Sequence, residues 1–310
     1  MTFMTRERLR QALPAITLAI LLAAIYVKQP LALKPFGLNL MLQYSVPVAL
    51  ATLAQMFVIA VNDLDLSVGP FVGLVTCIAG MFLADQPLVG WGLLLLAIAA
   101  YVAIGALVHL RHLPSIVVTL GMSFVWLGIS VLLFPAPGGT DPGWLRGLMG
   151  LHVPVVPFPI VAAVVIAVVV ELGLMHSSYG AVLRGSGGNP RAVARAGWSL
   201  LKIKMVMYGL AGTFGVLSGL ALLGLSSAAD AHIADRYTLY SIAGVILGGG
   251  EFIGGRVSPW GAVLGAITLM LAGSYLTFLK ISSDWQIGAQ GAILIIVLAL
   301  RALIARRESR

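Results

Sequence analysis

Residues 89–108 read VGWGLLLLAIAAYVAIGALV, twenty consecutive residues without one charged side chain. An α-helix rises about 1.5 Å per residue, so a run of this length crosses the roughly 30 Å hydrocarbon core of a bilayer. The rest of the chain has the same character, since 60% of its 310 residues are hydrophobic and 10% are charged. Soluble domains average about 45–50% apolar and about 25% charged residues. We therefore expect lipid to be the solvent of this chain.

Comparable apolar runs recur along the whole chain, divided by short polar breaks or by breaks that contain Pro or Gly. The ten membrane spans that we expect cover residues 12–30, 39–61, 67–84, 89–108, 114–134, 155–175, 202–224, 238–253, 257–279 and 286–305. The eighth is the least regular, because Gly248, Gly249 and Gly250 interrupt it. The pattern predicts an all-α polytopic membrane protein with a single transmembrane domain, residues 1–310.

Basic residues indicate how these spans are oriented, because cytoplasmic loops of membrane proteins are enriched in Lys and Arg. With ten spans and the N-terminus inside, 14 of the 19 Lys and Arg lie in cytoplasmic segments and 5 in external ones. Both termini are then cytoplasmic. The largest external loop is residues 135–154, and the largest internal one is residues 176–201, hereafter the cytoplasmic loop. Orientation in a membrane thus explains the net charge of +8 without nucleic acid as a partner.

Catalysis by this chain is not expected. The pattern G-x-x-x-x-G-K-[ST], whose backbone cradles nucleotide phosphates, does not occur in the sequence. The five histidines form no H-E-x-x-H pair, and the single cysteine, Cys77, lies in an apolar stretch. We therefore expect no cofactor or metal on this chain, and we do not expect it to be an enzyme.

The cytoplasmic loop contains GNPRAVARAG at residues 188–197, which predicts a short helix with both ends specified. Asn189 can cap it by accepting a hydrogen bond from an unpaired backbone N–H. Pro190 suits the first helical position, where a missing N–H has no cost, and Gly197 can adopt the left-handed conformation that ends a helix. A helix of two turns is unstable alone in water, so this one needs a partner surface. That surface is either its own helical bundle or a groove in another protein, towards which Ala192 and Ala196 leave room.

A polar break, VNDLDLSVGP at residues 61–70, separates the second and third spans. Carboxylates are costly if they lie deep in a membrane, so such residues are candidates for function. Asp65 or Ser67 can cap the third helix, where the helix dipole favours negative charge. The break is therefore either a capped turn at the cytoplasmic interface or part of a gate or permeation path. Its candidate residues are Asn62, Asp63, Asp65 and Ser67.

Four motifs together resemble the ribose-type, or simple sugar, permease family of ABC importers. They are DLSVG at residues 65–69, VTLGM at 118–122, GGN at 187–189 followed by Ala192 and Gly197, and the glycines Gly248, Gly249, Gly254, Gly255, Gly261 and Gly265. The motifs run in the family's order from residue 65 to about residue 290. Thr119 and Ser123, in the span that the second motif opens, join the candidates for the gate or path.

The resemblance implies that the loop helix couples the permease to an ATPase. The residues that it assigns to this coupling are Gly188, Asn189, Pro190, Arg191, Ala192, Val193, Arg195, Ala196 and Gly197. The sequence departs from the family at Asn62 and Asp63, where two glycines are usual, and at Val193, Trp198 and Gly250. These departures indicate a divergent member and leave a heterodimer of unlike permeases open.

By the same resemblance, the chain works with several partners. A second permease subunit, identical or paralogous, completes the path. A periplasmic sugar-binding protein delivers a small sugar, such as a pentose, hexose or polyol. An ABC ATPase with two fused nucleotide-binding modules carries ATP and Mg, so this chain binds neither. Two alternatives remain open: an ABC permease for nucleosides or branched-chain amino acids, and an ion-coupled secondary transporter.

Overall fold

The structure of the protein is a computed structural model that describes residues 2–151, 156–226, 228–252 and 254–282, with the single positions 285, 288, 291 and 292. Within these residues every regular element is a helix, as the sequence predicts, and the one β-bridge joins Gly138 and Ala229. The helices are α1 Thr2–Lys28, η1 Pro30–Leu33, α2 Pro35–Leu42, α3 Ser45–Ile59, α4 Val68–Phe82, α5 Pro87–Leu110, α6 Ser115–Leu133, α7 Gly143–Met149, α8 Phe158–Val170, η2 Glu171–Met175, α9 Ser178–Gly188, α10 Pro190–Arg195, α11 Leu200–Leu225, α12 Tyr237–Leu247 and α13 Pro259–Phe278.

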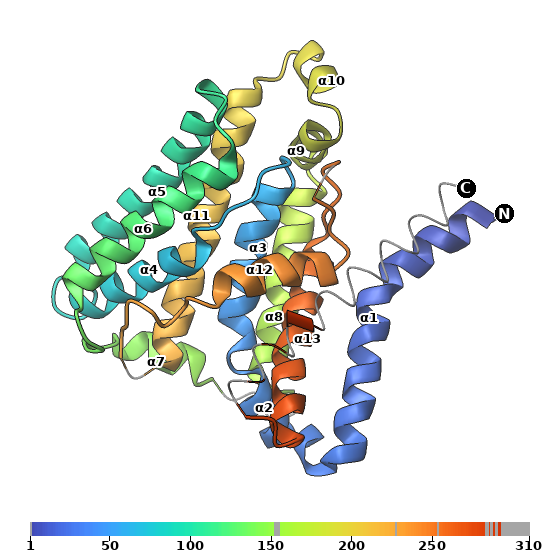
Figure 1. Ribbon diagram of the computed structural model, residues 1–310, viewed down its shortest axis with the longest axis vertical. Coiled ribbons are helices and arrows are strands. Elements are labelled where there is room, and N and C mark those ends of the chain that lie inside the picture. Colours follow the sequence, from blue (N-terminus) through green and yellow to red (C-terminus); the bar gives the residue numbers. More distant parts are fainter. Residues whose placement is uncertain are drawn as a thin grey trace.

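Helices α3 and α11 form the centre of the bundle. Every residue of α3 is buried, and α11 packs along both α3 and α5. Figure 1 shows α5 and α6 on one side of this centre, α8 and α13 on the other, and α1 at the outer edge. The apolar side chains of α5 and α6 are largely exposed, with Leu132 84% and Val117 65% accessible. Such faces suit contact with lipid or with another membrane subunit.

Five helices are long and apolar enough to cross a membrane, and six if the bent pair of α2 and α3, which meet at 44°, forms one span. They are α5, α6, α8 with its π-helical continuation η2, α11 and α13. Helices α4 and α12 fall at expected spans but are shorter, at 15 and 11 residues. The expected span at residues 286–305 lies outside the described residues except for the single positions 288, 291 and 292. The chain is thus a multi-pass membrane protein, described here with five or six clear spans.

Helix α12 ends early because glycines bring it against α13. A Cβ atom at Gly248 would collide with the backbone of Gly261, and one at Gly265 with the backbone of Gly244. The two helices therefore meet backbone to backbone, a contact that only small residues permit. After Gly248 the chain turns through Gly249 at a φ of +95°, as the irregular eighth span led us to expect. Figure 1 shows α12 lying across the bundle and not along it.

Candidate functional site

Asp65 lies in the turn between α3 and α4 and is fully buried. Its Oδ1 accepts hydrogen bonds from the backbone N–H and the hydroxyl of Ser67, both at 2.7 Å, and its Oδ2 accepts one from the Tyr101 hydroxyl at 2.8 Å. The amide of Gln55 pairs with the Asp65 backbone, nitrogen to oxygen at 3.0 Å and oxygen to nitrogen at 3.2 Å. Burial raises the pKa of the Asp65 carboxyl above its ordinary value, and the hydrogen bonds from Ser67 and Tyr101 offset this only in part. Both carboxylate oxygens are thus matched by donors, which a buried charge requires.

The predicted cap of the third span takes a different form. Helix α4 begins at Val68 with Ser67 as its N-cap residue, but the Ser67 side chain makes no capping hydrogen bond. Asp65 instead accepts from the N–H group two residues further on, which is an Asx turn that precedes the helix. The carboxylate therefore shapes the entry to α4 and is enclosed by protein.

Backbone groups beside Asp65 bind α6. The N–H of Leu64 donates to the Ser115 hydroxyl at 3.1 Å, and the N–H of Leu66 donates to the Thr119 hydroxyl at 3.0 Å. Thr119 thus lies with the turn residues. Ser123 does not, because its hydroxyl donates to the carbonyl of Leu120 in its own helix at 2.6 Å. The structure therefore brings together five of the six gate or path candidates.

Two of those five, Asn62 and Asp63, reach out of the turn. Asp63 Oδ2 lies 2.8 Å from the Lys204 ammonium and accepts a hydrogen bond from the Tyr208 hydroxyl at 3.1 Å. The Asn62 amide binds two distant backbone segments, at Gly187 and Gly254. The turn is therefore tied by side chains to α5 and α11 and to the cytoplasmic loop.

Aromatic rings pack around the Tyr101 end of this network. The Phe71 and Tyr101 rings have centroids 4.4 Å apart, and the Tyr101 and Trp126 rings are nearly parallel at 6.3 Å. Each ring comes from a different helix, α4, α5 or α6, so the cluster fixes these three helices relative to one another. Large aromatic contacts of this kind exclude water and add packing free energy. Tyr101 is consequently rigid as well as hydrogen-bonded.

The predicted helix in the cytoplasmic loop is present as α10. Asn189 Oδ1 accepts from the N–H of Ala192 at 3.0 Å, Pro190 occupies the first turn, and Gly197 has a φ of +88°. The Trp198 N–H returns to the carbonyl of Val193 at 3.3 Å, which completes the usual six-to-one closure of such an end. The sequence prediction of both helix ends is confirmed.

Exposure shows which surface α10 leaves open. None of its residues is buried, and among the predicted coupling residues Val193 alone is half-buried, against the core and against Gly185. Ala192 and Ala196 are exposed. Packing beneath the bundle therefore accounts for Val193, while the alanine face remains open to a partner.

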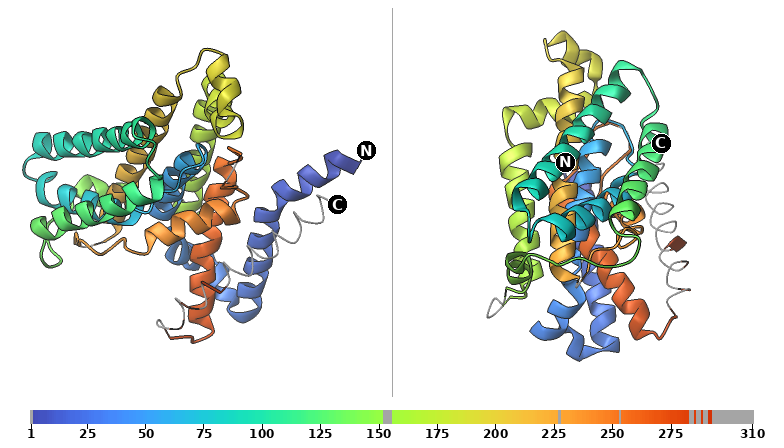
Figure 2. Two further views of the ribbon diagram at one scale, coloured as in Figure 1. Left: turned by 45° about the horizontal axis from the view of Figure 1, so that its top comes forward. Right: turned by 90° about the vertical axis from the view of Figure 1, so that its left-hand side faces the viewer.

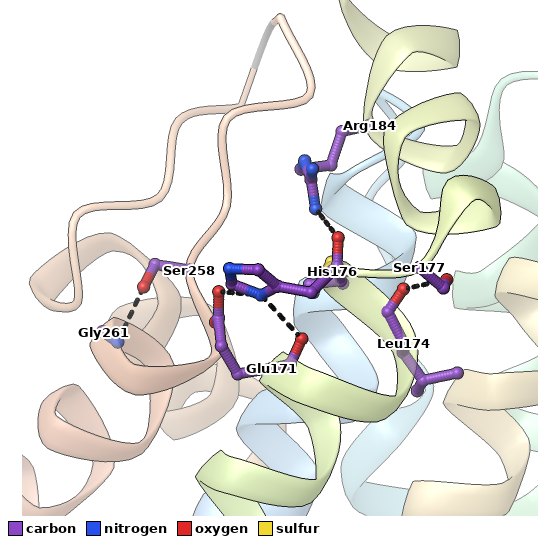
Figure 3. A network of polar contacts seen from close by, with 8 residues as sticks. Glu171, Leu174, His176, Ser177, Arg184, Ser258 and Gly261 are labelled. Atoms are coloured by element: carbon purple, nitrogen blue, oxygen red, sulfur yellow. Dashed lines mark hydrogen bonds and ion pairs between the residues drawn. The ribbon is translucent and has the colours of Figure 1, made fainter.

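The first part of the cytoplasmic loop is anchored to the end of η2, as Figure 3 shows. Arg184 on α9 donates from Nη1 to the Met175 carbonyl at 2.6 Å. Ser177 caps α9, and His176 Nδ1 lies 3.3 Å from a carboxylate oxygen of Glu171. These contacts fix the direction in which α9 carries the chain towards α10.

An open cavity of about 380 Å³ lies where the turn, the α5–α6 connection and the start of α11 meet. Its polar lining residues are Asn62, Asp63, His109, His112, Ser115 and Lys204. Carboxylate, ammonium, imidazole and hydroxyl groups can all exchange hydrogen bonds with the hydroxyls of a small ligand. Among the described residues, no three His, Cys, Asp or Glu side chains gather closely enough to hold a metal ion.

Tyr101, Lys204 and Tyr208 are among the site residues that were not predicted from the sequence. Tyr101 is an isolated polar group in a long apolar run, which gave no reason to choose it. Lys204 and Tyr208 are four residues apart, so they share a face of α11, and a lysine inside an apolar helix is a usable signal for an acidic partner. In the sequence analysis Lys204 is one of the 14 basic residues assigned to the cytoplasmic side and has no other predicted role.

Comparison with known proteins gives consistent results. A sequence model of the family described as branched-chain amino acid transport system / permease component matches residues 37–298. The ribose import permease protein RbsC of Escherichia coli (strain K12) is 25% identical over 307 residues, covering 95% of this chain and 94% of the relative. The galactose/methyl galactoside import permease protein MglC of Salmonella typhimurium is 26% identical over 317 residues, covering 94% of each chain.

A third relative is the autoinducer 2 import system permease protein LsrD of Klebsiella pneumoniae, which is 26% identical over 308 residues, 94% of this chain and 92% of the relative. No solved structure matches the chain significantly. The resemblance drawn from the four sequence motifs is confirmed by these matches, which extend over almost the whole chain.

Proposed function

The chain belongs to this family of ABC importer permeases, and we propose that it is the membrane permease subunit of an ATP-driven, binding-protein-dependent importer of a small sugar. One observation carries the proposal: relatives named for the import of ribose, galactose and autoinducer 2 align with at least 94% of its residues. The polar cavity beside the turn supports it, because a lining of paired charges and hydroxyls suits a neutral, hydroxyl-rich ligand. We place the inner end of the permeation path there.

The open face of α10 supports coupling to a separate ATPase. In this proposal an ATPase with two fused nucleotide-binding modules docks on α10, and a second permease, identical or paralogous, completes the path. A periplasmic binding protein delivers sugar from outside. ATP shifts the permease between conformations because the ATPase binds nucleotide unequally in their docked arrangements. ATP and Mg stay on the ATPase.

The proposed topology has ten spans, with both termini on the cytoplasmic side of a bacterial inner membrane. It is tested by single cysteines introduced after Cys77 has been replaced. Cysteines at residues 137–150 are expected to react with an impermeant maleimide added to intact cells, whereas those at residues 186–196 react only after the membrane is opened. External labelling of the second set contradicts the topology.

The function is tested in proteoliposomes that contain this permease, the ATPase and permease partners and the binding protein from the same operon. We expect uptake of one radiolabelled sugar that requires ATP and survives a proton ionophore. Labelled ribose, galactose, leucine and uridine are compared, because the family description also names branched-chain amino acids. Uptake of leucine or uridine in place of every sugar contradicts the substrate class.

A second candidate, an ion-coupled secondary transporter, gains support from the complete burial of Asp65 beside Tyr101. Buried acidic residues in membrane proteins often carry protons or ions. The donors on both Asp65 oxygens favour a fixed carboxylate over one that binds and releases a proton. Uptake that collapses with the ionophore and ignores ATP would establish this alternative.

A further inference from the structure

Asn62 and Asp63 occupy the outer edge of the turn whose centre is Asp65. We propose that they form a two-residue clamp, which holds the chain on both sides of α10 against the turn and transmits displacement of α10 to Asp65. The inference rests on the proposed function, since it concerns how ATPase docking reaches the membrane part. The side-chain bonds of Asn62 and Asp63 go to Gly187, Gly254, Lys204 and Tyr208, all of which lie outside α10. The clamp is therefore distinct from the docking surface.

The first arm of the clamp is the Asn62 side chain. Its Nδ2 donates to the Gly187 carbonyl at 2.7 Å, and its Oδ1 accepts from the Gly254 N–H at 3.0 Å. Gly187 lies 125 positions away in the chain and Gly254 lies 192 away. Asn62 holds a left-handed conformation with a φ of +60°, which asparagine tolerates better than most residues. One amide thus joins the turn, the end of α9 and the loop before α13.

The junction that this amide closes is tightly packed. A Cβ atom at Gly187 would collide with the Ala60 carbonyl and lie only 2.7 Å from the Cα of Gly255. A Cβ atom at Gly255 would in turn collide with the Arg184 carbonyl. Three backbone segments are therefore in contact with no space between them, and a packed contact transmits displacement instead of absorbing it.

The second arm is the Asp63 carboxylate, which is bound by Lys204 and Tyr208 of α11. Lys204 lies just beyond the end of the cytoplasmic loop. The side chains of Asp63 and Lys204 are 11% and 19% exposed, so solvent screens this ion pair less than a surface pair. Because Gly187 lies before α10 and Lys204 after it, the two arms hold the loop on both sides of the docking helix.

The clamp leads directly to the buried carboxylate. Asp65 follows Asp63 by two residues, and the Leu64 N–H between them is itself bound to Ser115. Asp65 is then fixed to Tyr101 and to the start of α4. A displacement of the loop therefore has a short, hydrogen-bonded route to α4, α5 and α6.

The test measures sugar imported per ATP hydrolysed in proteoliposomes that hold the whole importer. Asn62→Gly removes the amide yet accepts the left-handed backbone, and Lys204→Met removes the second arm. We expect each variant to lower the ratio at least threefold while ATPase co-purification and melting temperature stay near wild type. Lys204→Arg, which keeps the cation, is expected to restore most of the ratio. The matched controls are Lys280→Gly, at another left-handed residue, and Lys202→Met, at an exposed lysine of α11.

The outcomes separate the clamp from other roles. An unchanged ratio in both Asn62→Gly and Lys204→Met overturns the clamp. A higher half-saturating sugar concentration with an unchanged ratio overturns it too, because the residues would then act on the sugar alone. A purely structural role would lower the melting temperature in parallel with every activity, which also contradicts the proposal. If the wild-type assembly imports no sugar with ATP, the proposed function itself is contradicted, and this outcome is distinct from a failure of the clamp, which appears only in the variants.

Discussion

The turn at residues 62–67 and helix α10 are both short polar interruptions of an apolar chain, yet they differ in how their polar groups are used. In the turn, Asp65 is buried and both carboxylate oxygens accept protein donors. In α10 no residue is buried, and the hydrogen bonds that define it are those of its own two ends. The turn is complete within the described chain, whereas α10 has a folded shape and an open face. The difference indicates that the turn stabilises the packing of the helices around it and that α10 presents a surface for a partner protein.

The largest expected effect is at Asp65. Asp65→Ala removes the acceptor of the Ser67 N–H and of the Ser67 and Tyr101 hydroxyls. The two hydroxyls, 3.2 Å apart, can bond to each other, but the N–H and one hydroxyl hydrogen are left unsatisfied, and each unsatisfied buried group costs about 1–3 kcal/mol. Loss of a cap alone would cost about 1 kcal/mol. We therefore expect a clear drop in the melting temperature of the detergent-purified protein and nearly complete loss of sugar uptake.

Two further variants sharpen this test. Asp65→Asn keeps one acceptor oxygen and is expected to be intermediate, while Asp85→Ala, at an exposed carboxylate, is expected to match the wild type. If Asp65→Ala melts and transports like Asp85→Ala, the turn is not the fixed centre that its contacts indicate.

The next largest effect is expected at the open face of α10, where substitutions should weaken ATPase association without changing the melting temperature. Ala192→Trp and Ala196→Trp place a large ring where close approach is expected, so ATPase association should fall about tenfold, the equivalent of 1.4 kcal/mol. The melting temperature of the permease alone should not change, because both alanines are exposed. Co-purification of the ATPase measures the first effect, with Ala181→Trp at an exposed position of α9 as control. Full association and full coupling in both variants would make the loop an ordinary connector.

These two regions also differ in how far they could be predicted from sequence. Both ends of α10 follow from Asn189, Pro190 and Gly197, because capping acts between residues three to five positions apart. The contacts of the turn do not follow in this way, since Tyr101 is 36 positions from Asp65 and Gly187 is 125 from Asn62. Composition predicted a helical membrane protein and three glycines predicted a break in the eighth span, but only tertiary packing shows that α12, at 11 residues, meets the glycines of α13 backbone to backbone.

A smaller effect is expected at Arg191, an exposed basic residue of α10. Arg191→Glu reverses a charge that suits an acidic groove, but exposed ion pairs contribute only about 0–1 kcal/mol. ATPase association should therefore weaken about two- to fivefold. Salt is the discriminating measurement: the difference from wild type should shrink between low and high ionic strength, because exposed charges are screened. A difference that salt does not alter would show that Arg191 contributes through packing and not through charge.

The smallest expected effect compares two hydroxyls four residues apart on α6. Thr119 accepts from the Leu66 N–H at 3.0 Å and so belongs to the turn, whereas Ser123 donates within its own helix. Thr119→Val keeps the shape of the side chain but leaves that N–H without its acceptor, which costs about 1 kcal/mol. Ser123→Ala removes only a hydrogen bond to the carbonyl of Leu120 in the same helix and leaves the bonds of the turn intact. The free energy of unfolding should therefore change by no more than about 0.5 kcal/mol.

Melting temperature and uptake of these two purified variants, measured in parallel, check the comparison at its finest scale. Because the Leu66 N–H lies next to Asp65, Thr119→Val should lower uptake as well as stability, although less than Asp65→Ala. Ser123→Ala should change neither. Equal behaviour of the two variants would mean that Thr119 supports the turn through packing alone, and the hydrogen bond from Leu66 would then be incidental to the rigidity of the turn. A larger loss of uptake in Ser123→Ala than in Thr119→Val would move the permeation path away from the turn and along α6.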